Sequence, residues 1–237
     1  MNLLHFKRLL LSLLFLPFLL SATSPAYRNK KKLANHVYEP YKQFLFEAKY
    51  DSAEEKNYLY ILMKVTDEIR YGGTKIEYIY FCEMPDTNKI RLDFTYEDSL
   101  KKCHHWNEYT QVEANPKYIW LHPPRAHFHG LADYYPFPEI NIPVKVGKNY
   151  KRSTITFHEP RLQGQMLKFS YEIKIKELET YKYQSRQIDV YRISGQAKSR
   201  LGEHSFYHLF NEQLGFVHWY YNLNDIETLE LSLVGAY

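Results

Sequence analysis

Histidine is the chemistry-bearing residue that gathers most densely in this sequence. The cluster and its nearest carboxylate consist of His104, His105, His122, His127, His129 and Asp133. Imidazole binds zinc and copper, and two of these side chains, His127 and His129, would point to one side of an extended segment. The spacing matches no established zinc motif, however, and Pro123-Pro124 is typical of an exposed loop. We therefore expect neither a metal site nor a cofactor here.

Two carboxylates and one arginine are the next candidates. Glu139 and Glu159 flank a proline-rich stretch, but acid–base work needs a cleft and tuned pKa values, and no pattern places them in one. Arg125 follows two prolines. Its guanidinium is suited either to clamping a carboxylate or phosphate or to tying its own loop to an acidic neighbour. There is no Gly-x-Ser-x-Gly elbow. We predict no catalytic residues and favour a non-enzymatic protein.

The N-terminus has the layout of a secretory signal peptide. Lys7 and Arg8 precede an apolar run, Leu9–Leu20, and small residues follow it. The run is short for a bilayer span, and no cysteine follows it that would carry a lipid anchor. Residues 1–26 are therefore assigned to the signal peptide and its cleavage region, and the protein is expected in the periplasm or outside the cell. An uncleaved anchor helix is the alternative.

Export changes how the two cysteines are interpreted. Cys82 ends one strand-like run and Cys103 lies beyond the next. In an oxidising compartment two such cysteines often pair, and closing this loop contributes roughly 3 kcal/mol in the chain-entropy model. Two separate buried thiols are the alternative, because spacing does not establish geometry. We predict a structural disulfide.

The elements that must position these residues are strands. The chain has 23 Tyr, 14 Phe and 3 Trp but only 9 Gly, a composition that favours sheet. In Leu167–Lys176 apolar and polar residues alternate, as in a strand with one buried and one wet face. A hairpin turn is expected at Gly72-Gly73 and a short helix at Ser99–His104. Further strands are predicted at 44–50, 58–71, 76–81, 91–97, 109–113, 118–122, 187–193, 205–210, 216–221 and 228–234.

The stretch Tyr118–Phe157 organises the expected fold. It contains five prolines and two glycines, residues that fix or free the backbone angle φ. Such a crossing is expected to pin two sheet segments together. We predict an all-β, mainly antiparallel fold, either a curled single sheet or a partly open barrel, of about ten strands with few short helices.

Length and charge limit the remaining possibilities. Residues 27–237 are long enough for one β domain, and we expect one. The net charge of +4 falls by two, to +2, without the two basic residues of the leader. Nucleic-acid binding needs a clustered basic face, whereas the basic run Lys30–Lys32 is typical of a solvated tail. We expect no nucleic-acid partner and no transmembrane segment after signal cleavage.

Three pieces of the chain carry a resemblance. They are Trp120–Arg125, Tyr135–Ile140 running on to Pro143–Lys148, and Phe210–Val217 before a leucine-rich last strand. Together they resemble a group of exported, uncharacterised proteins of Bacteroidetes-type bacteria. More distantly, the chain is similar to periplasmic domains with a curled single sheet, like lipoprotein carriers. The resemblance covers roughly the second half of the chain, and it implies no known reaction and no catalytic residues.

Three classes of function remain. The first is an exported binding module that holds an apolar or amphipathic molecule in a curved sheet. The second is a surface glycan- or protein-binding β domain that uses exposed aromatics, and a row such as Phe216, His218 and Tyr220 would favour it. The third is a hydrolase with an unrecognised site. The sequence favours the first.

The leader assignment predicts a processed N-terminus. The mature exported chain should begin after Ala22 or Ala26, because small residues at these positions suit signal peptidase. N-terminal sequencing of the exported protein measures this. A mature chain that still begins at Met1 would refute the assignment.

Overall fold

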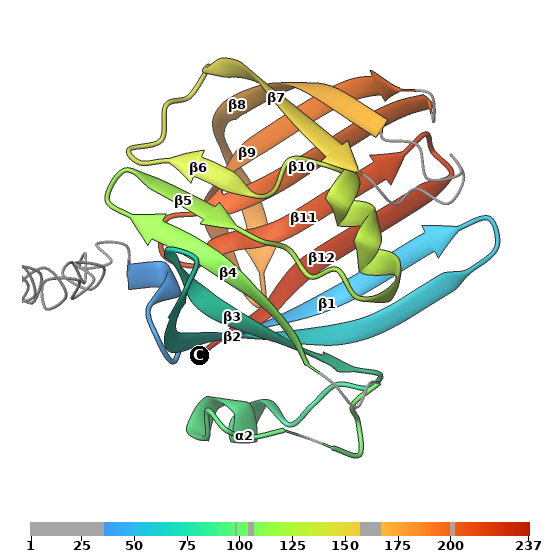
Figure 1. The fold of residues 1–237 in the computed structure, drawn as a ribbon. Helices are drawn as coiled ribbons and strands as arrows, with labels where there is room; N and C mark the ends of the chain where they lie inside the picture. Colours follow the sequence, from blue (N-terminus) through green and yellow to red (C-terminus); the bar gives the residue numbers. More distant parts are fainter. Residues whose placement is uncertain (1–35, 98, 104–106, 157–166, 200–201) are drawn as a thin grey trace, which may run out of the picture. The chain divides into compact units, whose positions relative to one another are not determined.

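The computed structural model describes residues 36–97, 99–103, 107–156, 167–199 and 202–237, and most of them lie in strands (Figure 1). The predicted leader lies outside the described residues. Within them, no helix is both long and apolar enough to cross a membrane. The helices are η2 (His36–Tyr38), α2 (Thr87–Leu92) and η3 (His127–Tyr134). The strands are β1 (Gln43–Ser52), β2 (Lys56–Arg70), β3 (Gly73–Phe81), β4 (Glu108–Asn115), β5 (Tyr118–Leu121), β6 (Glu139–Asn141), β7 (Asn149–Thr156), β8 (Leu167–Tyr183), β9 (Arg186–Ser199), β10 (Gly202–Asn211), β11 (Gly215–Leu223) and β12 (Glu227–Ala236).

The strands form one sheet of twelve in the order β6-β5-β4-β3-β2-β1-β12-β11-β10-β9-β8-β7. Every neighbouring pair is antiparallel. The first and last strands pair in the middle, so two meanders run outward from them to the two edges. The prediction of an antiparallel, curled single sheet is confirmed, and the last three strands form the expected meander.

The link between β6 and β7 forces this sheet to curl. In a flat sheet of this order the two edge strands would lie about 53 Å apart, eleven spacings of about 4.8 Å. The eight residue steps from Asn141 to Asn149 span at most about 28 Å. The edges must therefore approach each other, and Arg152 Nε of β7 donates to Glu139 Oε1 of β6 at 2.8 Å. The expectation that this crossing pins two sheet segments together is confirmed.

The inner face of the curl holds the main hydrophobic core. Phe46 of β1 stacks on Trp219 of β11 with ring centroids 5.0 Å apart, and both side chains are buried. The crossing contributes Leu131, Ala132 and Tyr135 to the same core. It therefore covers part of the inner face, which is the role that a second sheet layer has in a sandwich.

A second, smaller core lies on the opposite face of β1, β2 and β3. It contains Leu45, Leu62, Ile79, Phe81 and Ile90. The cover is the segment between β3 and β4, and polar side chains of the sheet also hold it in place: Gln43 Nε2 donates to Ile90 O at 2.6 Å, and Lys64 Nζ donates to Tyr96 O at 3.1 Å. These central strands are buried on both faces.

The strand predicted at 91–97 is wrong. Helix α2 occupies Thr87–Leu92 because Asp86 caps its N-terminus, accepting from Asn88 N and Lys89 N. In a strand, Ile90 and Leu92 would lie on the same buried face. Ile90 is buried, but Leu92 is 79% exposed. The predicted helix at 99–104 is not observed either: residues 99–103 form a turn and a bridge from Lys102 to Phe81, and His104 lies outside the described residues.

The hairpin between β2 and β3 turns one residue earlier than predicted. Arg70 pairs with Gly73, and the two loop residues, Tyr71 and Gly72, have φ values of 49° and 92°. Two positive φ angles are typical of a type I′ turn. Gly73 is instead a strand residue, where a Cβ atom would lie 2.8 Å from the carbonyl oxygen of Val112.

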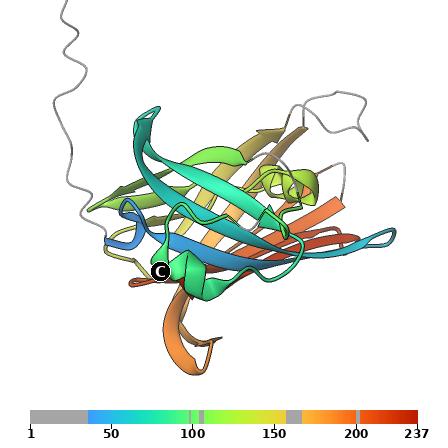
Figure 2. The same cartoon turned by 90° about the horizontal axis from the view of Figure 1, so that it is seen from below.

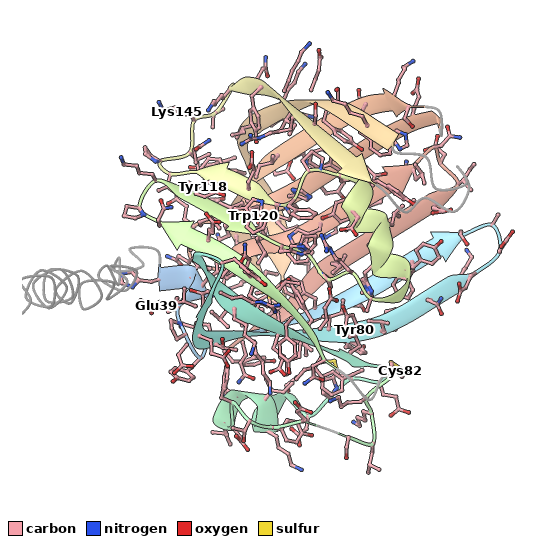
Figure 3. All side chains as sticks on the ribbon, viewed as in Figure 1. Glu39, Tyr80, Cys82, Tyr118, Trp120 and Lys145 are labelled. Carbon is pink, nitrogen blue, oxygen red and sulfur yellow. A yellow bond between two sulfur atoms is a disulfide. The ribbon has the colours of Figure 1, made fainter. Side chains whose placement is uncertain are left out.

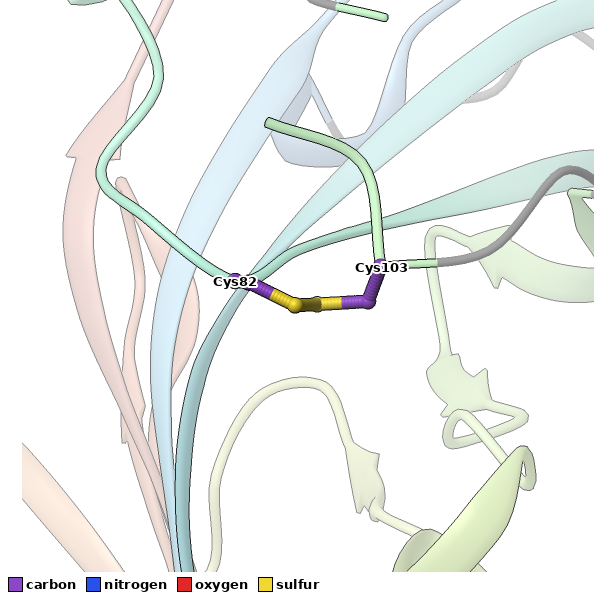
Figure 4. The surroundings of a disulfide bond; sticks show 2 residues. All are labelled: Cys82 and Cys103. Carbon is purple, nitrogen blue, oxygen red and sulfur yellow. A yellow bond between two sulfur atoms is a disulfide. The ribbon is translucent and has the colours of Figure 1, made fainter. Parts of the chain in front are cut away.

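The two cysteines close the base of the segment that covers the second core. The structure places the Sγ atoms of Cys82 and Cys103 within bonding distance, with Cα atoms 5.2 Å apart (Figure 4). Backbone hydrogen bonds run beside them, from Cys82 N to Lys101 O at 2.8 Å and from Cys103 N to Tyr80 O at 2.9 Å. The geometry suits a disulfide that fastens this cover to β3.

Oxidation of this pair in the native protein remains a prediction. The double variant Cys82→Ser/Cys103→Ser should lose about 3 kcal/mol of unfolding free energy in urea, because the unfolded chain regains the entropy of the open loop. Reductant should lower the stability of the parent protein to that of the variant and leave the variant unchanged. Two alkylated thiols in the native exported protein would contradict the prediction.

Candidate functional site

The histidines that lie close together in the sequence do not converge on one point in the part of the chain that the structure describes. The ring of His122 lies 4.5 Å from that of Phe137, and burial lowers the pKa of His122 to about 4. His129 is fully buried, and its Nδ1 lies 2.7 Å from the carbonyl oxygen of Ala126. No three His, Cys, Asp or Glu side chains gather as metal ligands within the described residues. His104, His105 and the side chain of His127 lie outside them.

The expectation of an exposed loop at Pro123-Pro124 is wrong. Both prolines are buried, because the chain here enters the crossing that packs on the inner face. The carbonyl oxygen before them, on His122, accepts from Tyr78 Oη at 2.7 Å and from Thr110 Oγ1 at 3.3 Å. These hydrogen bonds hold the start of the crossing against β3 and β4.

The charged candidates stabilise the structure. Arg125 Nε lies 2.9 Å from Asp133 Oδ1, so this arginine ties its loop to an acidic neighbour, one of the two roles weighed from the sequence. Glu139 is engaged by Arg152 at the edge of the sheet. Glu159 lies outside the described residues. The two described candidates, Arg125 and Glu139, each form an ion pair with a neighbouring side chain.

Sequence reasoning missed Glu108 as an anchor of the crossing. Its carboxylate accepts from the backbone N–H groups of Arg125 at 2.9 Å and Ala126 at 3.2 Å, and from the hydroxyl of Tyr80. Tyr80 belongs to the main core and lies on β3 close to Cys82 (Figure 3). Arg125 and Ala126 lie outside the strands, so their N–H groups have no partner in the sheet. The Glu108 carboxylate accepts these hydrogen bonds and thereby holds the segment in place.

Aromatic rings occupy the inner face opposite the crossing. Tyr135 lies with its ring centroid 5.0 Å from Tyr221, 5.7 Å from Tyr171 and 6.0 Å from Phe206. Burial raises the pKa of all three tyrosines, so they are neutral. His208 lies beside them, 5.5 Å from the Tyr221 ring, and burial lowers its pKa to about 3. These rings of the inner face are therefore uncharged and contact one another.

The outer face of β8–β11 carries a groove of about 850 Å³. The β8–β9 hairpin bends past a bulge between Ile175 and Leu178, and its tip folds over the outer side of β12, where Gln184 Nε2 donates to Val234 O at 2.8 Å. Figure 2 shows this hairpin, in orange, curving away from the neighbouring strands. The bend makes one side of the sheet's outer face concave.

Strand register arranges the groove in rows. In one row, Lys174 of β8 pairs with Ser194 of β9, Ser194 with Tyr207 of β10, and Tyr207 with Tyr220 of β11. A parallel row contains Glu172, Gln196, Ser205 and Asn222. Side chains of the first row run from a cation through a hydroxyl to two aromatic rings, whereas the second is polar throughout. All eight line the groove.

The aromatic end of the first row is held rigidly. Tyr207 stacks on Tyr220 at 5.1 Å and on His218 at 5.3 Å, and the guanidinium of Arg192 lies 4.0 Å from the Tyr207 ring centroid. Both carboxylate oxygens of Glu179 in turn accept hydrogen bonds from the guanidinium of Arg192. Among the described residues no hydrogen bond engages the hydroxyl of Tyr220, which is partly exposed and faces the groove.

His218 is the support beneath this platform. Its Nδ1 lies 3.0 Å from Ser232 Oγ and its Nε2 lies 3.1 Å from Tyr207 Oη. Burial, followed by the charges of Arg192 and Lys49, lowers the pKa of His218 to about 4. The ring is therefore neutral at physiological pH and fixes the orientation of Tyr207.

The row Phe216, His218 and Tyr220, which would have favoured a glycan- or protein-binding surface, does not form as such. The pairing shifts between Leu209↔His218 and Phe210↔Phe216, so the strand holds an extra residue there. A bulge reverses the alternation of faces, and Phe216 turns inward and is fully buried. Tyr207, which completes the row in its place, comes from the neighbouring strand. Only the pairing register identifies it.

Buried neutral histidines make the fold sensitive to acid. The pKa values of His122, His208 and His218 are lowered from 6.5, so below pH 6.5 the unfolded chain binds protons that the folded chain does not. The unfolding free energy should therefore fall as the pH drops from 6.5 towards 4, by at most about 1.4 kcal/mol per pH unit for each histidine. Urea unfolding at pH 7 and pH 5 should show less dependence on pH in His208→Phe than in the parent. Equal pH dependence would contradict this.

No model of a known protein family matches the chain, and no curated protein matches it. Solved structures do. A protein of Bacteroides fragilis, described as exported and as having a YmcC-like fold, has a TM-score of 0.47 and 10% identity over 84% of this chain and 96% of its own. A protein of Parabacteroides distasonis described as a lipoprotein has a TM-score of 0.45 and 10% identity, with the same coverage. The hypothetical lipoprotein YmcC of Escherichia coli has a TM-score of 0.38 and 9% identity over 84% of this chain and 86% of its own. These are proteins of the kind that the sequence resembles.

Proposed function

We propose that this chain is an exported, non-enzymatic binding module, a single domain over residues 27–237, and that it binds a carbohydrate chain in the groove on the outer face of β8–β11. The observation that carries the proposal is the row of Lys174, Ser194, Tyr207 and Tyr220, which strand pairing places side by side in the groove. The leader-like N-terminus supports export.

The platform of Tyr207 and Tyr220 suits a sugar ring. A tyrosine offers a flat apolar face, a hydroxyl that donates and accepts, and little conformational entropy to lose on binding. Here the entropy loss is smaller still, because His218 and Arg192 already hold Tyr207. A preorganised surface spends less free energy on ordering when the ligand arrives.

The row beside the platform suits sugar hydroxyls. Glu172, Gln196, Ser205 and Asn222 present a carboxylate, two amides and a hydroxyl. These groups donate and accept in fixed planes, as recognition of neighbouring hydroxyl groups requires. Two of these groups already have partners, since Glu172 lies 3.3 Å from Lys151 Nζ and Asn222 Nδ2 donates to Asp225 Oδ1. An apolar molecule would desolvate Gln196 and Ser205 without offering them hydrogen bonds, at a cost of about 1–3 kcal/mol each.

The inner face supports this choice over an apolar ligand inside the sheet. Rings of the sheet and of the crossing contact one another there, since Tyr135 of the crossing lies against Tyr171 of β8 and Tyr221 of β11. Figure 3 shows many side chains inside the curl. The excess of aromatic residues in the sequence is thus accounted for by this core and by the platform outside.

A hydrolase is the second candidate, and one contact favours it. Ser199 Oγ lies 2.6 Å from His204 Nε2 at the end of the groove. A serine beside a histidine is the start of a nucleophile–base arrangement. Binding without turnover is what the proposed function requires, so any hydrolysis of the bound polysaccharide that Ser199→Ala abolishes would favour the hydrolase.

Affinity electrophoresis tests the proposal. Native gels containing dextran, xylan or polygalacturonate should retard the protein in at least one case. Tyr220→Ala should weaken that retardation by tenfold or more, because loss of an aromatic anchor costs about 2 kcal/mol. Tyr71→Ala is the matched control, a tyrosine that is 84% exposed at the β2–β3 turn and outside the groove.

Three results would contradict the proposal. The first is the absence of retardation in all three gels. The second is retardation that Tyr220→Ala leaves unchanged. The third is equal weakening by Tyr71→Ala, since that ring does not line the groove.

A further inference from the structure

We infer that the carbohydrate this groove takes is acidic, a chain of sugar rings bearing carboxylates, with Lys174 and Lys176 as the groups that recognise its charge. The inference rests on the proposed function and adds the chemical class of the ligand. It comes from comparing how the charged side chains of the groove are paired.

The carboxylates of the groove are already engaged. Glu172 lies 3.3 Å from Lys151 Nζ, and Glu203 pairs with Lys198. Asp225 accepts from Asn222 Nδ2 at 2.7 Å. Among the residues that the structure describes, these three are the carboxylates that line the groove.

Two of the cations are not engaged. Arg192 is held by Glu179 at 2.7 Å, but Lys174 and Lys176 have no acidic partner within 4 Å among the described residues. Both are exposed and line the groove. Being two residues apart on β8, they project from the same face of the strand. Each is an ammonium group with three unused donors.

The position of these lysines defines the kind of ligand. Lys174 and Tyr220 are the ends of one cross-strand row, three strand spacings or about 14 Å apart. A carbohydrate that contacts both is a chain of several rings, with a ring on the tyrosines and an anionic group at β8. Asp225 lies in the turn after β11, at the far end, so among the described residues the unpaired positive charge lies at the β8 end.

The test compares two polymers that differ only in charge. Polygalacturonate and its fully methyl-esterified form share one sugar backbone, and isothermal titration measures the affinity of each. The acidic polymer should bind at least tenfold more tightly at low ionic strength, and the difference should shrink as sodium chloride screens the lysines. The monomer, galacturonic acid, should bind far more weakly than a polymer that spans the row.

Substitutions then assign the preference to the two lysines. The double variant Lys174→Gln/Lys176→Gln should lose the preference for the acidic polymer and keep its affinity for the esterified one. Lys182→Gln is the matched control, an exposed lysine of the same strand that does not line the groove. It should behave as the parent protein does. Circular dichroism confirms that each variant is folded.

The outcomes separate this inference from the proposed function. Equal binding of the two polymers, abolished by Tyr220→Ala, overturns the acidic ligand and leaves a carbohydrate-binding groove. An acidic preference that survives in the double lysine variant overturns the assignment to these residues. Binding of neither polymer, together with no retardation in the polysaccharide gels, overturns both.

Discussion

The fold depends on the mismatch between a wide sheet and a short link. Twelve strands run from β6 to β7, and the chain joins these two edges directly through residues 142–148. The sheet curls because the link cannot reach across a flat one. The two edge strands are not paired through their backbones. A side-chain ion pair between Arg152 of β7 and Glu139 of β6 connects them instead.

The curl separates the two faces of the sheet into different chemistries. The inner face is crowded by rings and partly covered by the crossing. Burial keeps His208 and Tyr221 of this face neutral, since it lowers the pKa of His208 and raises that of Tyr221. Such a face contributes stability through apolar burial. The outer face of β8–β11 keeps its charges and hydroxyls, and the bend of the β8–β9 hairpin makes it concave. This outer face is where we propose that a polar ligand binds.

Local alternation predicted much of the fold and little of the site. In Leu167–Lys176 the period of two identifies both the strand and its buried face, as β8 bears out. The same period misled at 91–97, where the cap at Asp86 starts a helix, and at Phe216, where a bulge reverses the faces. The groove combines Lys174, Ser194, Tyr207 and Tyr220 from four strands. Their register depends on turns and bulges that single strands do not encode.

Selective labelling of tyrosine tests the central claim, that ligand binds outside the curl, most directly. Carbon-13 labelled tyrosine rings report on both faces in one NMR titration with the polysaccharide that retards the protein. The account predicts that the signals of Tyr207 and Tyr220 shift and that those of Tyr135, Tyr171 and Tyr221 stay in place. Shifts confined to the three inner tyrosines would contradict it and place the ligand inside the sheet.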